Sequence, residues 1–445
     1  MTETTLPRGL ALTDLHASLA DPLLEAMMFL NEVTSRFPEA ISFAPGRPYE
    51  GLFEPERITD YLADYTAYLE RDLGFTPDQV RTTLFQYGRT NGQIHDLIAK
   101  TVANDDGMHV SADSVVVTVG AQEGMLLALR ALFARPTDVL LVTSPCYVGI
   151  TGAARLLDIE TVPVPEGESG LDPEAVAEAA ARVAASGRRA RALYVVPDFA
   201  NPSGTSMAVP ARRRLLEVAD AADLLVIEDN PYGFFSRDEQ FRPTLKSLDT
   251  ERRVIYLGSF AKTCFPGARL GYVLADQEVV APDGGRTLLA DQLAKIKSMT
   301  TVNTPSLSQA VIGGILVRSG CRLRDTNQDT IRFYRNNLNL LLDELDRHFP
   351  ITRRASLGID WNTPGGGFFV VVTVPFVVDN RALERSARDY GVLWTPMSSF
   401  YLDGGGQHQL RLSCSYVEPD RLRDGLARLA QFITDQTATF AGQKP

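Results

Sequence analysis

A lysine that directly follows an apolar run is the first residue in this sequence with evident chemical potential. Lys262 lies among small and apolar residues in the segment GSFAKTCFPGAR, which spans residues 258–269. Burial lowers the pKa of an amine, and a neutral amine can attack an aldehyde. Ser259 and Arg269 of the same segment offer a hydroxyl and a guanidinium, both suited to binding a phosphate. A surface lysine at a strand end is the structural alternative, and this segment alone leaves both interpretations open.

Polar residues also follow two other apolar runs. Asp229 and Tyr232 lie in EDNPYG after the run at 224–228, and Asn201 lies in PDFANPSG after the run at 193–196. The carboxyl ends of parallel strands are where α/β proteins bind ligands. Asp229 could therefore hold a protonated pyridine nitrogen, while Tyr232 and Asn201 could donate hydrogen bonds to a ring oxygen. Each segment also fits an ordinary turn.

Two further segments place groups suited to a flat, anionic ligand at strand ends. Gly120, Ala121 and Gln122 lie where an apolar run passes into a helical stretch. The free N–H groups of a helix N-terminus favour an anion. Tyr147 follows another apolar run, where its ring could stack on a flat cofactor. A tight turn before a helix and a buried core tyrosine are the plain alternatives.

The elements that must position these residues alternate along the chain from about residue 110. Short apolar runs are separated by amphipathic helical stretches, as at 171–186, which indicates a mostly parallel sheet covered by helices on both faces. The run at 269–274 follows its predecessor after a short loop, so we expect an antiparallel neighbour there. The strands are expected at 115–119, 139–143, 159–164, 193–196, 224–228, 254–258 and 269–274.

Beyond residue 305 the pattern changes to long helices and alternating strands. Helices are expected at 306–319 and 325–347, and strands around 367–374 and 409–415. This pattern is typical of a smaller α+β domain. The predicted fold is thus α/β, with a large domain over residues 61–325, a small domain over 326–445, and an N-terminal segment, 1–60, that joins the small domain.

Composition excludes several classes of protein. The 445 residues carry a net charge of −11 with only six lysines and no basic run, so binding to nucleic acid or to an anionic membrane is not expected. The four cysteines and five histidines have no metal-ligand spacing, and we expect no metal. The start of the sequence lacks a signal-peptide pattern, and the most apolar stretch, 368–378, is too short to span a bilayer. We therefore expect a cytoplasmic protein.

The order of these motifs is more specific than any one of them. VTVGAQEGM, PDFANPSG, EDNPYG and GSFAK with PGARLGY follow one another as in the fold-type I aminotransferases that use pyridoxal phosphate, class I/II, and the chain resembles that family over nearly its whole length. The residues that carry the resemblance are Gly120, Tyr147, Asn201, Asp229, Tyr232, Ser259, Lys262 and Arg269.

The resemblance implies a role for each residue around the cofactor. Lys262 would form the Schiff base with pyridoxal 5′-phosphate and later move the substrate proton, and Asp229 would keep the pyridine nitrogen protonated. Asn201 and Tyr232 would hydrogen-bond the ring oxygen, and Tyr147 would stack on the ring. The phosphate would be held by Ser259, Arg269 and the backbone of Gly120, Ala121 and Gln122.

The same resemblance implies a homodimer and a set of substrate contacts. Tyr87, in QYG, is similar to the family's tyrosine that reaches the phosphate across the dimer interface. Arg411 resembles the arginine that binds the substrate α-carboxylate, and Gly46 the glycine of the loop that closes over the substrate. We expect Arg411, Gly46 and Asn201 to contact the substrate. Arg47 could recognise a distal group if it faces inward, and an exposed arginine is the alternative.

The reaction that the resemblance implies is transfer of an amino group between an L-amino acid and a 2-oxo acid. The branch is similar to the aminoadipate and kynurenine enzymes, and QYGRTNGQ and EDNPYGFF are similar to phenylglycine-forming transaminases of antibiotic pathways, which indicates specialised metabolism. The sequence departs from the family at 396–400 (PMSSF), which leaves open a lyase, γ-replacement or cyclising enzyme acting on S-adenosylmethionine or a similar amino acid. A ligand-sensing regulator is disfavoured, because only 45 residues precede Gly46 and no basic winged-helix pattern is found among them.

Overall fold

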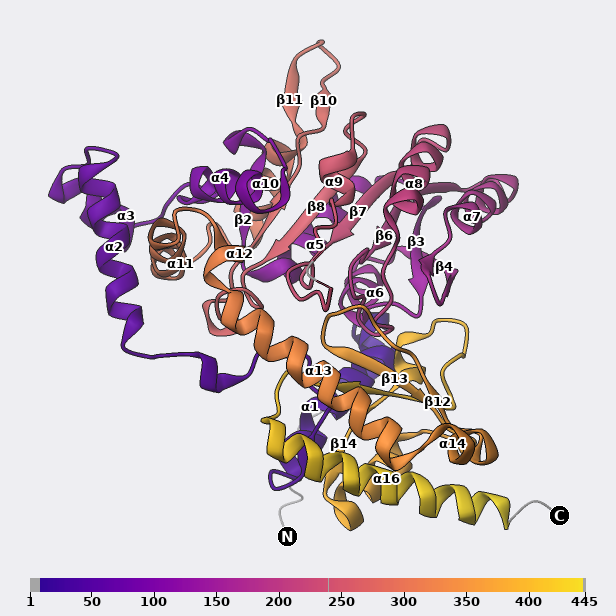
Figure 1. Cartoon of the computed structure of the whole chain (residues 1–445). Coiled ribbons are helices and arrows are strands. Elements are labelled where there is room, and N and C mark those ends of the chain that lie inside the picture. The colour runs from indigo at the N-terminus through magenta and orange to yellow at the C-terminus, as the bar shows by residue number, and fades with distance from the viewer. Residues whose placement is uncertain (1–8, 239, 443–445) are drawn as a thin grey trace, which may run out of the picture.

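The computed structural model describes residues 9–238 and 240–442, and an eight-stranded sheet forms its larger half (Figure 1). The strand order is β2-β9-β8-β7-β6-β3-β4-β5. The central strands β8, β7, β6, β3 and β4 run parallel, whereas β9 is antiparallel to both of its neighbours. The predicted mostly parallel mixed sheet is confirmed. The strands are β2 (Val115–Thr118), β3 (Asp138–Ser144), β4 (Glu160–Gly167), β5 (Gly170–Leu171), β6 (Arg189–Val195), β7 (Leu225–Asp229), β8 (Val254–Ser259) and β9 (Gly271–Leu274).

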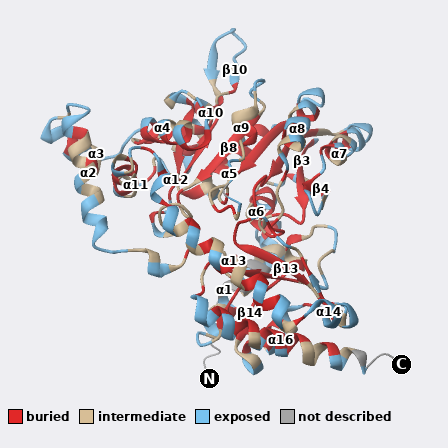
Figure 2. Ribbon diagram, in the orientation of Figure 1, coloured by how far each residue is buried: buried red, intermediate tan, exposed pale blue. Residues whose placement is uncertain are grey.

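Helices cover both faces of this sheet because successive strand residues point to opposite sides. Leu140 and Val142 of β3 pack with α5 (Gly120–Leu132), α6 (Val148–Leu156) and α10 (Leu289–Thr300). Val139 and Leu141 pack on the other face with α7 (Pro173–Ala185), α8 (Val209–Ala221) and α9 (Leu245–Leu248). Burial on both faces explains why the central strands are continuous apolar runs. Strands β3, β6, β7 and β8 are buried along almost their whole length, as Figure 2 shows, whereas β4 is mostly half-buried or exposed.

A second, antiparallel sheet lies beside the first and has its own core. Its strand order is β12-β13-β16-β15, and its core is centred on Trp394 and Phe432. The expected helix at 325–347 is divided in two, α12 (Leu323–Thr326) and α13 (Gln328–His348), and α13 runs from the large sheet toward the second one (Figure 1). The other elements here are β12 (Asp360–Trp361), β13 (Phe369–Thr373), β15 (Thr395–Pro396), β16 (Gln409–Ser413), α14 (Ile351–Leu357), α15 (Asn380–Arg385) and α16 (Pro419–Ala441).

The N-terminal part of the chain joins this second sheet through one short pairing. Strand β1 (Ile41–Ser42) lies parallel to β14 (Val392–Leu393), with Ile41 opposite Val392. Phe43, which follows β1, is fully buried in the same core as Trp394. Helix α1 (Pro22–Arg36) precedes β1. The segment that directly follows β1, residues 44–47, is thereby brought between the two sheets.

The periphery of the large sheet carries the remaining elements. Helices α2 (Arg57–Arg71) and α3 (Pro77–Phe85) extend to one side, where Figure 2 shows most of their outer surface exposed. They are followed by α4 (His95–Asp106) and, much later in the chain, by α11 (Ser306–Arg318), against which α2 packs. The hairpin β10 (Glu278–Val280) and β11 (Arg286–Leu288) projects at the top of the view in Figure 1. Among the described residues, no helix is both long and apolar enough to cross a membrane.

Candidate active site

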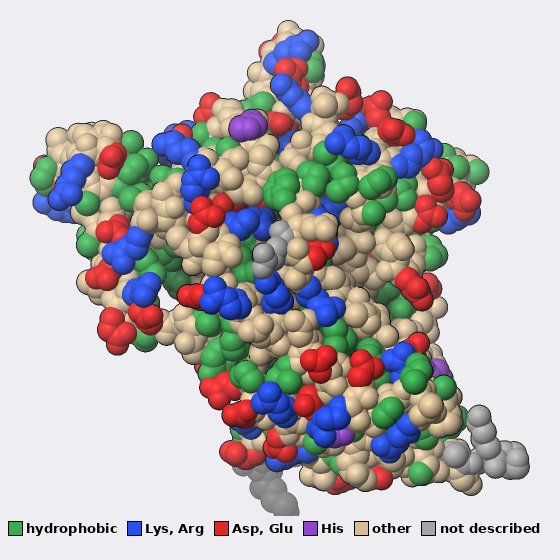
Figure 3. Space-filling view, viewed as in Figure 1, with side chains coloured by type: hydrophobic (Ala, Val, Ile, Leu, Met, Phe, Trp, Pro, Cys, Tyr) green, Lys and Arg blue, Asp and Glu red, His purple; other side chains and the backbone are tan. Residues whose placement is uncertain are grey.

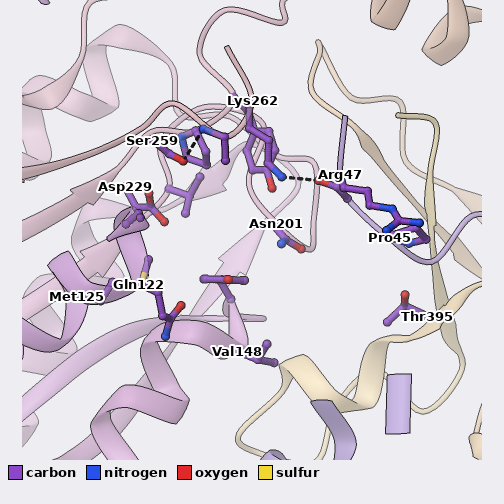
Figure 4. A pocket seen from close by; sticks show the side chains of 18 of the residues that line it. Pro45, Arg47, Gln122, Met125, Val148, Asn201, Asp229, Ser259, Lys262 and Thr395 are labelled. Carbon is purple, nitrogen blue, oxygen red and sulfur yellow. Dashed lines mark hydrogen bonds between the residues drawn. The ribbon is translucent and has the colours of Figure 1, made fainter. Parts of the chain in front are cut away.

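A cavity of about 450 Å³ lies where the carboxyl ends of the large sheet meet the second sheet. On one side it is lined by Gln122, Asp229, Ser259 and Lys262, and on the other by Arg47 and Thr395, with Asn201 between them (Figure 4). Arg411 also lines the cavity. The remaining lining residues are Thr34, Ala44, Pro45, Gly46, Gly120, Ala121, Met125, Tyr147, Val148, Val196, Pro231, Tyr232, Ala261, Arg269 and Phe400. Apart from Tyr87, all twelve site residues named from the sequence line this one cavity.

Lys262 lies in the turn after β8, where it is held by the opposite side of the cavity. Its Nζ donates a hydrogen bond of 2.6 Å to the carbonyl oxygen of Gly46. Burial, with smaller contributions from the nearby Arg269 and Arg411 cations, lowers the pKa of Lys262 to about 8. A substantial share of this amine is therefore neutral near physiological pH, which a nucleophile toward an aldehyde requires.

Asp229 is the last residue of β7, and one of its two carboxylate oxygens is left without a partner. Oδ2 accepts a hydrogen bond of 2.7 Å from the hydroxyl of Tyr194, whereas Oδ1 is buried and has no hydrogen-bond partner among the described residues. Burial raises the pKa of Asp229 to about 6. A buried acceptor without a partner is costly. The site is thus suited to a ligand that brings its own N–H.

Tyr194 was not identified from the sequence as a site residue. It lies in β6 and is fully buried, surrounded in sequence by aliphatic residues. The only signal was a hydroxyl in an otherwise apolar strand, where a buried O–H needs an acceptor.

The turn between β2 and α5 forms a cradle that only glycine permits. Gly120 has φ +72°, and a Cβ atom placed on it would lie 2.7 Å from Nη2 of Arg269. The guanidinium therefore sits directly against the N-terminus of α5, where Ala121 and Gln122 also line the cavity. A cation next to free helix N–H groups makes a binding site for an anion such as phosphate.

Arg411, on β16, is buried and contacts both sheets. Its Nη2 donates to the carbonyl oxygen of Ala44 at 2.8 Å and to Oγ1 of Thr395 at 3.2 Å, and its Nη1 donates to Oδ1 of Asn201. Burial lowers the pKa of Arg411 to about 10, so the group remains a cation at neutral pH. Its Nε has no hydrogen-bond partner among the described residues. The guanidinium can therefore bind an added carboxylate.

Aromatic side chains shape the space between these charges. Tyr147 lines the cavity, and Tyr232 is buried edge-on against Phe368 and Phe369. Burial raises the pKa of both tyrosines, so their hydroxyls remain protonated donors. Gly46 lies so close to the ring of Phe369 that a Cβ would overlap it. Phe400, in the segment where the sequence departs from the family, lines the cavity beside Arg411.

Two of the residues considered from the sequence, Tyr87 and Arg47, are exposed. Tyr87 is 85% exposed and does not line the cavity of its own chain. Arg47 is exposed at the cavity mouth, and its guanidinium carbon lies 4.0 Å from the ring centre of Tyr416, whose face it covers. The exposed alternative for Arg47 is the one that the structure shows.

The residues present fit one kind of ligand. The partnerless Oδ1 of Asp229 suits a protonated ring nitrogen, the Gly120 cradle suits a phosphate, and Lys262 suits an aldehyde. Pyridoxal 5′-phosphate combines these three groups in one flat molecule.

Comparison with known proteins gives a consistent result. The description "aminotransferase class I and II" matches the chain over residues 76–429. A (S)-3,5-dihydroxyphenylglycine transaminase of Amycolatopsis orientalis is 50% identical over 429 residues, covering 96% of each chain. A 2-aminoadipate transaminase of Thermus thermophilus is 30% identical over 91% of this chain and 92% of the relative. The structure of a Pyrococcus horikoshii kynurenine aminotransferase is similar with a TM-score of 0.78 at 28% identity, covering 93% of this chain and 94% of that one.

Proposed function

Because the chain belongs to the class I and II aminotransferase family and is a pyridoxal-phosphate-dependent enzyme acting on amino acids and 2-oxo acids, we propose that it transfers the amino group of an arylglycine, in specialised metabolism. The observation that carries this proposal is the 50% identity to a 3,5-dihydroxyphenylglycine transaminase over 96% of both chains. The cavity supports it, since Val148 and Phe400 offer an apolar surface for an aromatic ring. The lyase and cyclising alternatives are not favoured, because the relatives are transaminases.

We assign the chemistry to the residues that meet in the cavity. When bound, pyridoxal phosphate withdraws electrons from the substrate Cα–H bond. Asp229 accepts a hydrogen bond from the protonated ring nitrogen at its free Oδ1, which keeps that proton in place. Lys262, whose pKa is about 8, would take the proton from Cα and deliver it to C4′, the cofactor carbon that carries the aldehyde.

The remaining residues bind and orient. Arg411 binds the substrate α-carboxylate in place of its present contacts with the carbonyl oxygen of Ala44 and with Thr395. Tyr147 packs on the cofactor ring, and Asn201 and Tyr232 donate to the ring oxygen. The phosphate is held by Ser259, Arg269 and the backbone of Gly120, Ala121 and Gln122, and Gly46 carries the loop that excludes water from the substrate side.

We propose that the working enzyme is a cytoplasmic homodimer that binds neither nucleic acid nor membranes. Tyr87 of the partner subunit would complete the phosphate site, since Tyr87 is too exposed and too remote to serve its own cavity. The four cysteines are all free, as is usual in a reducing compartment. The net charge of −11 disfavours polyanionic partners.

The test is a half-reaction on purified enzyme loaded with cofactor. We expect (S)-3,5-dihydroxyphenylglycine to convert the cofactor absorbance and to release one equivalent of the aryl 2-oxo acid. Phenylglycine, 2-aminoadipate and kynurenine serve as comparison donors. Rapid conversion by 2-aminoadipate or kynurenine with none by either arylglycine would refute the substrate class and leave the family assignment unchanged.

A further inference from the structure

A buried ion pair lies directly behind the phosphate cradle and belongs to no role assigned above. Glu123 is in the first turn of α5, and its Oε2 accepts a hydrogen bond of 2.6 Å from the backbone N–H of Val119, the residue before the helix. Lys297 of α10 donates to both carboxylate oxygens of Glu123, at 3.0 and 2.8 Å. The Lys297 side chain is fully buried and that of Glu123 nearly so.

Glu123 stabilises the turn before α5, but it also places a buried negative charge near the phosphate site. Its bond to the Val119 N–H ties the end of β2 to the start of α5, so the turn that carries Gly120 and Gln122 is held in one conformation. However, a buried carboxylate within one helical turn of an anion site opposes the binding of phosphate, because charges interact strongly away from water.

Lys297 is placed to neutralise the negative charge of Glu123. Its ammonium has three N–H donors and three acceptors, namely the two oxygens of Glu123 and Oγ1 of Thr301 at 2.8 Å. Thr301 in turn donates to Oε1 of Glu123 at 2.6 Å. All three N–H donors of Lys297 are satisfied within this network. Its charge therefore neutralises Glu123, and it has no donor left for a ligand.

The segment after α10 adds a second tie to the same strand. Thr304 is fully buried, and its hydroxyl donates to the carbonyl oxygen of Val117 in β2 at 2.9 Å. The chain from Lys297 to Thr304 thus braces the end of β2 at a side-chain pair and at a backbone oxygen. Lys297 follows Glu123 by 174 residues in the sequence, so this contact joins two distant parts of the chain.

We infer that Glu123 and Lys297 form a positioning pair for the cofactor phosphate: Glu123 fixes the turn, and Lys297 cancels the charge that would otherwise repel the phosphate. Neither residue lines the cavity or touches the ligand, and both act through the backbone of Gly120, Ala121 and Gln122. The inference concerns the phosphate alone and is independent of which amino acid the enzyme uses.

The experiment compares ligands with and without the phosphate on the apoenzyme. Pyridoxal phosphate and pyridoxal are titrated into wild type, Lys297→Met, Glu123→Gln and the double variant, and dissociation constants are obtained from absorbance. In Lys297→Met we expect pyridoxal phosphate to bind about tenfold more weakly while pyridoxal changes less than about twofold. The double variant, which has no buried charge, should regain most of the loss. Lys295→Met, which removes an exposed lysine of the same helix that donates to Gln292, is the matched control.

Two results would overturn the inference. Equal weakening of both ligands in Lys297→Met would show a general structural role, and an unchanged preference for the phosphorylated ligand would show no role in charge. If Lys297→Met does not fold, Glu123→Gln decides. It leaves the lysine charge uncancelled and keeps an amide oxygen that can accept from the Val119 N–H. Its preference for pyridoxal phosphate over pyridoxal must therefore equal or exceed that of wild type, and a lower preference refutes the pair.

Discussion

The cofactor side and the substrate side of the cavity are built differently. The cofactor side lies at the ends of neighbouring strands in the large sheet and comprises residues 120–122, 229, 259, 262 and 269. The substrate side is assembled from three segments far apart in the chain, residues 44–47, 395 and 411. The two sides differ in how they are held. Asp229 pairs with Leu257 in the ladder between β7 and β8, and Ser259 pairs with Gly271 in the ladder between β8 and β9. Arg411 is also held in a ladder, but its guanidinium in addition contacts Ala44 and Asn201, 367 and 210 residues away.

The difference separates two kinds of function. A single sheet edge suits a cofactor that stays bound, while a side assembled from three separate segments can adjust to a donor and then to an acceptor. The two sides also differ in charge. Cations line both sides of the cavity, whereas the buried carboxylate of Asp229 lies on the cofactor side. Over the face shown in Figure 3, by contrast, basic and acidic side chains are interspersed. The comparison predicts that substitutions on one side leave the other side's binding intact.

Lys262→Ala should have the largest effect, because this residue serves both sides: its Nζ contacts Gly46, and the proposed chemistry depends on it. We expect the half-reaction with every amino acid to fall by about 10⁴-fold or more, since both nucleophile and base are lost. Stopped-flow measurement of the cofactor absorbance tests this. Thermal unfolding of the apoenzyme is the control, and activity within tenfold of wild type would refute the assignment of the whole site.

Arg411→Gln should damage the substrate side alone. Removing the buried cation should lower kcat/KM for all α-amino acids by about 10²-fold, because the α-carboxylate loses its ion pair. Affinity for pyridoxal phosphate should stay within about threefold of wild type, since the phosphate site is on the other side.

The matched control for Arg411→Gln is Arg47→Gln, which removes an exposed arginine from the mouth of the same cavity. We expect little change in kcat/KM there, because an exposed cation is well screened. A loss in Arg47→Gln as large as that in Arg411→Gln would contradict the assignment of the carboxylate to Arg411. It would instead assign a substrate role to the exposed arginine.

Gly120→Ala should give the opposite result to Arg411→Gln. The added Cβ meets Nη2 of Arg269 at 2.7 Å, and φ of +72° is strained for alanine. We therefore expect affinity for pyridoxal phosphate to fall by about thirtyfold, while relative kcat/KM values among amino acids stay as in wild type once the enzyme is saturated with cofactor. Gly152→Ala, at a glycine with nothing within 4 Å, is the control, and equal losses in both variants would contradict the cradle.

How much the sequence could predict follows the same division between the sides. Strand ends are visible as apolar runs, so Asp229, Ser259 and Lys262 could be placed at one sheet edge from the sequence alone. Tyr194 and the Glu123–Lys297 pair could not, because nothing local distinguishes a tyrosine or lysine that turns inward. The contact of Arg411 with Ala44 depends on how two distant segments fold together, and resemblance alone indicated that arginine. The position of the partner's Tyr87 stays a prediction.

Tyr194→Phe should have the smallest effect and sharpens the account of the cofactor side. The hydroxyl donates to Oδ2 of Asp229 at 2.7 Å and so lowers a pKa that burial raises to about 6. Without that donor the pKa of Asp229 rises further. The carboxylate form is present only above its pKa, so activity lost on acidification should be lost at a higher pH in the variant. At pH 8, well above this pKa in either enzyme, kcat/KM should fall by only about threefold.

The measurement that checks this is the pH profile of kcat/KM between pH 5 and 8.5, with Tyr256→Phe as the control. Tyr256 is also buried, on β8, which pairs with the strand of Asp229, but the hydroxyl that donates to Asp229 is that of Tyr194. A structural role would lower activity by one factor at every pH and leave the acidic limb where it is. A shift of that limb in Tyr194→Phe alone requires that Tyr194 acts through the charge of Asp229, which no packing effect reproduces.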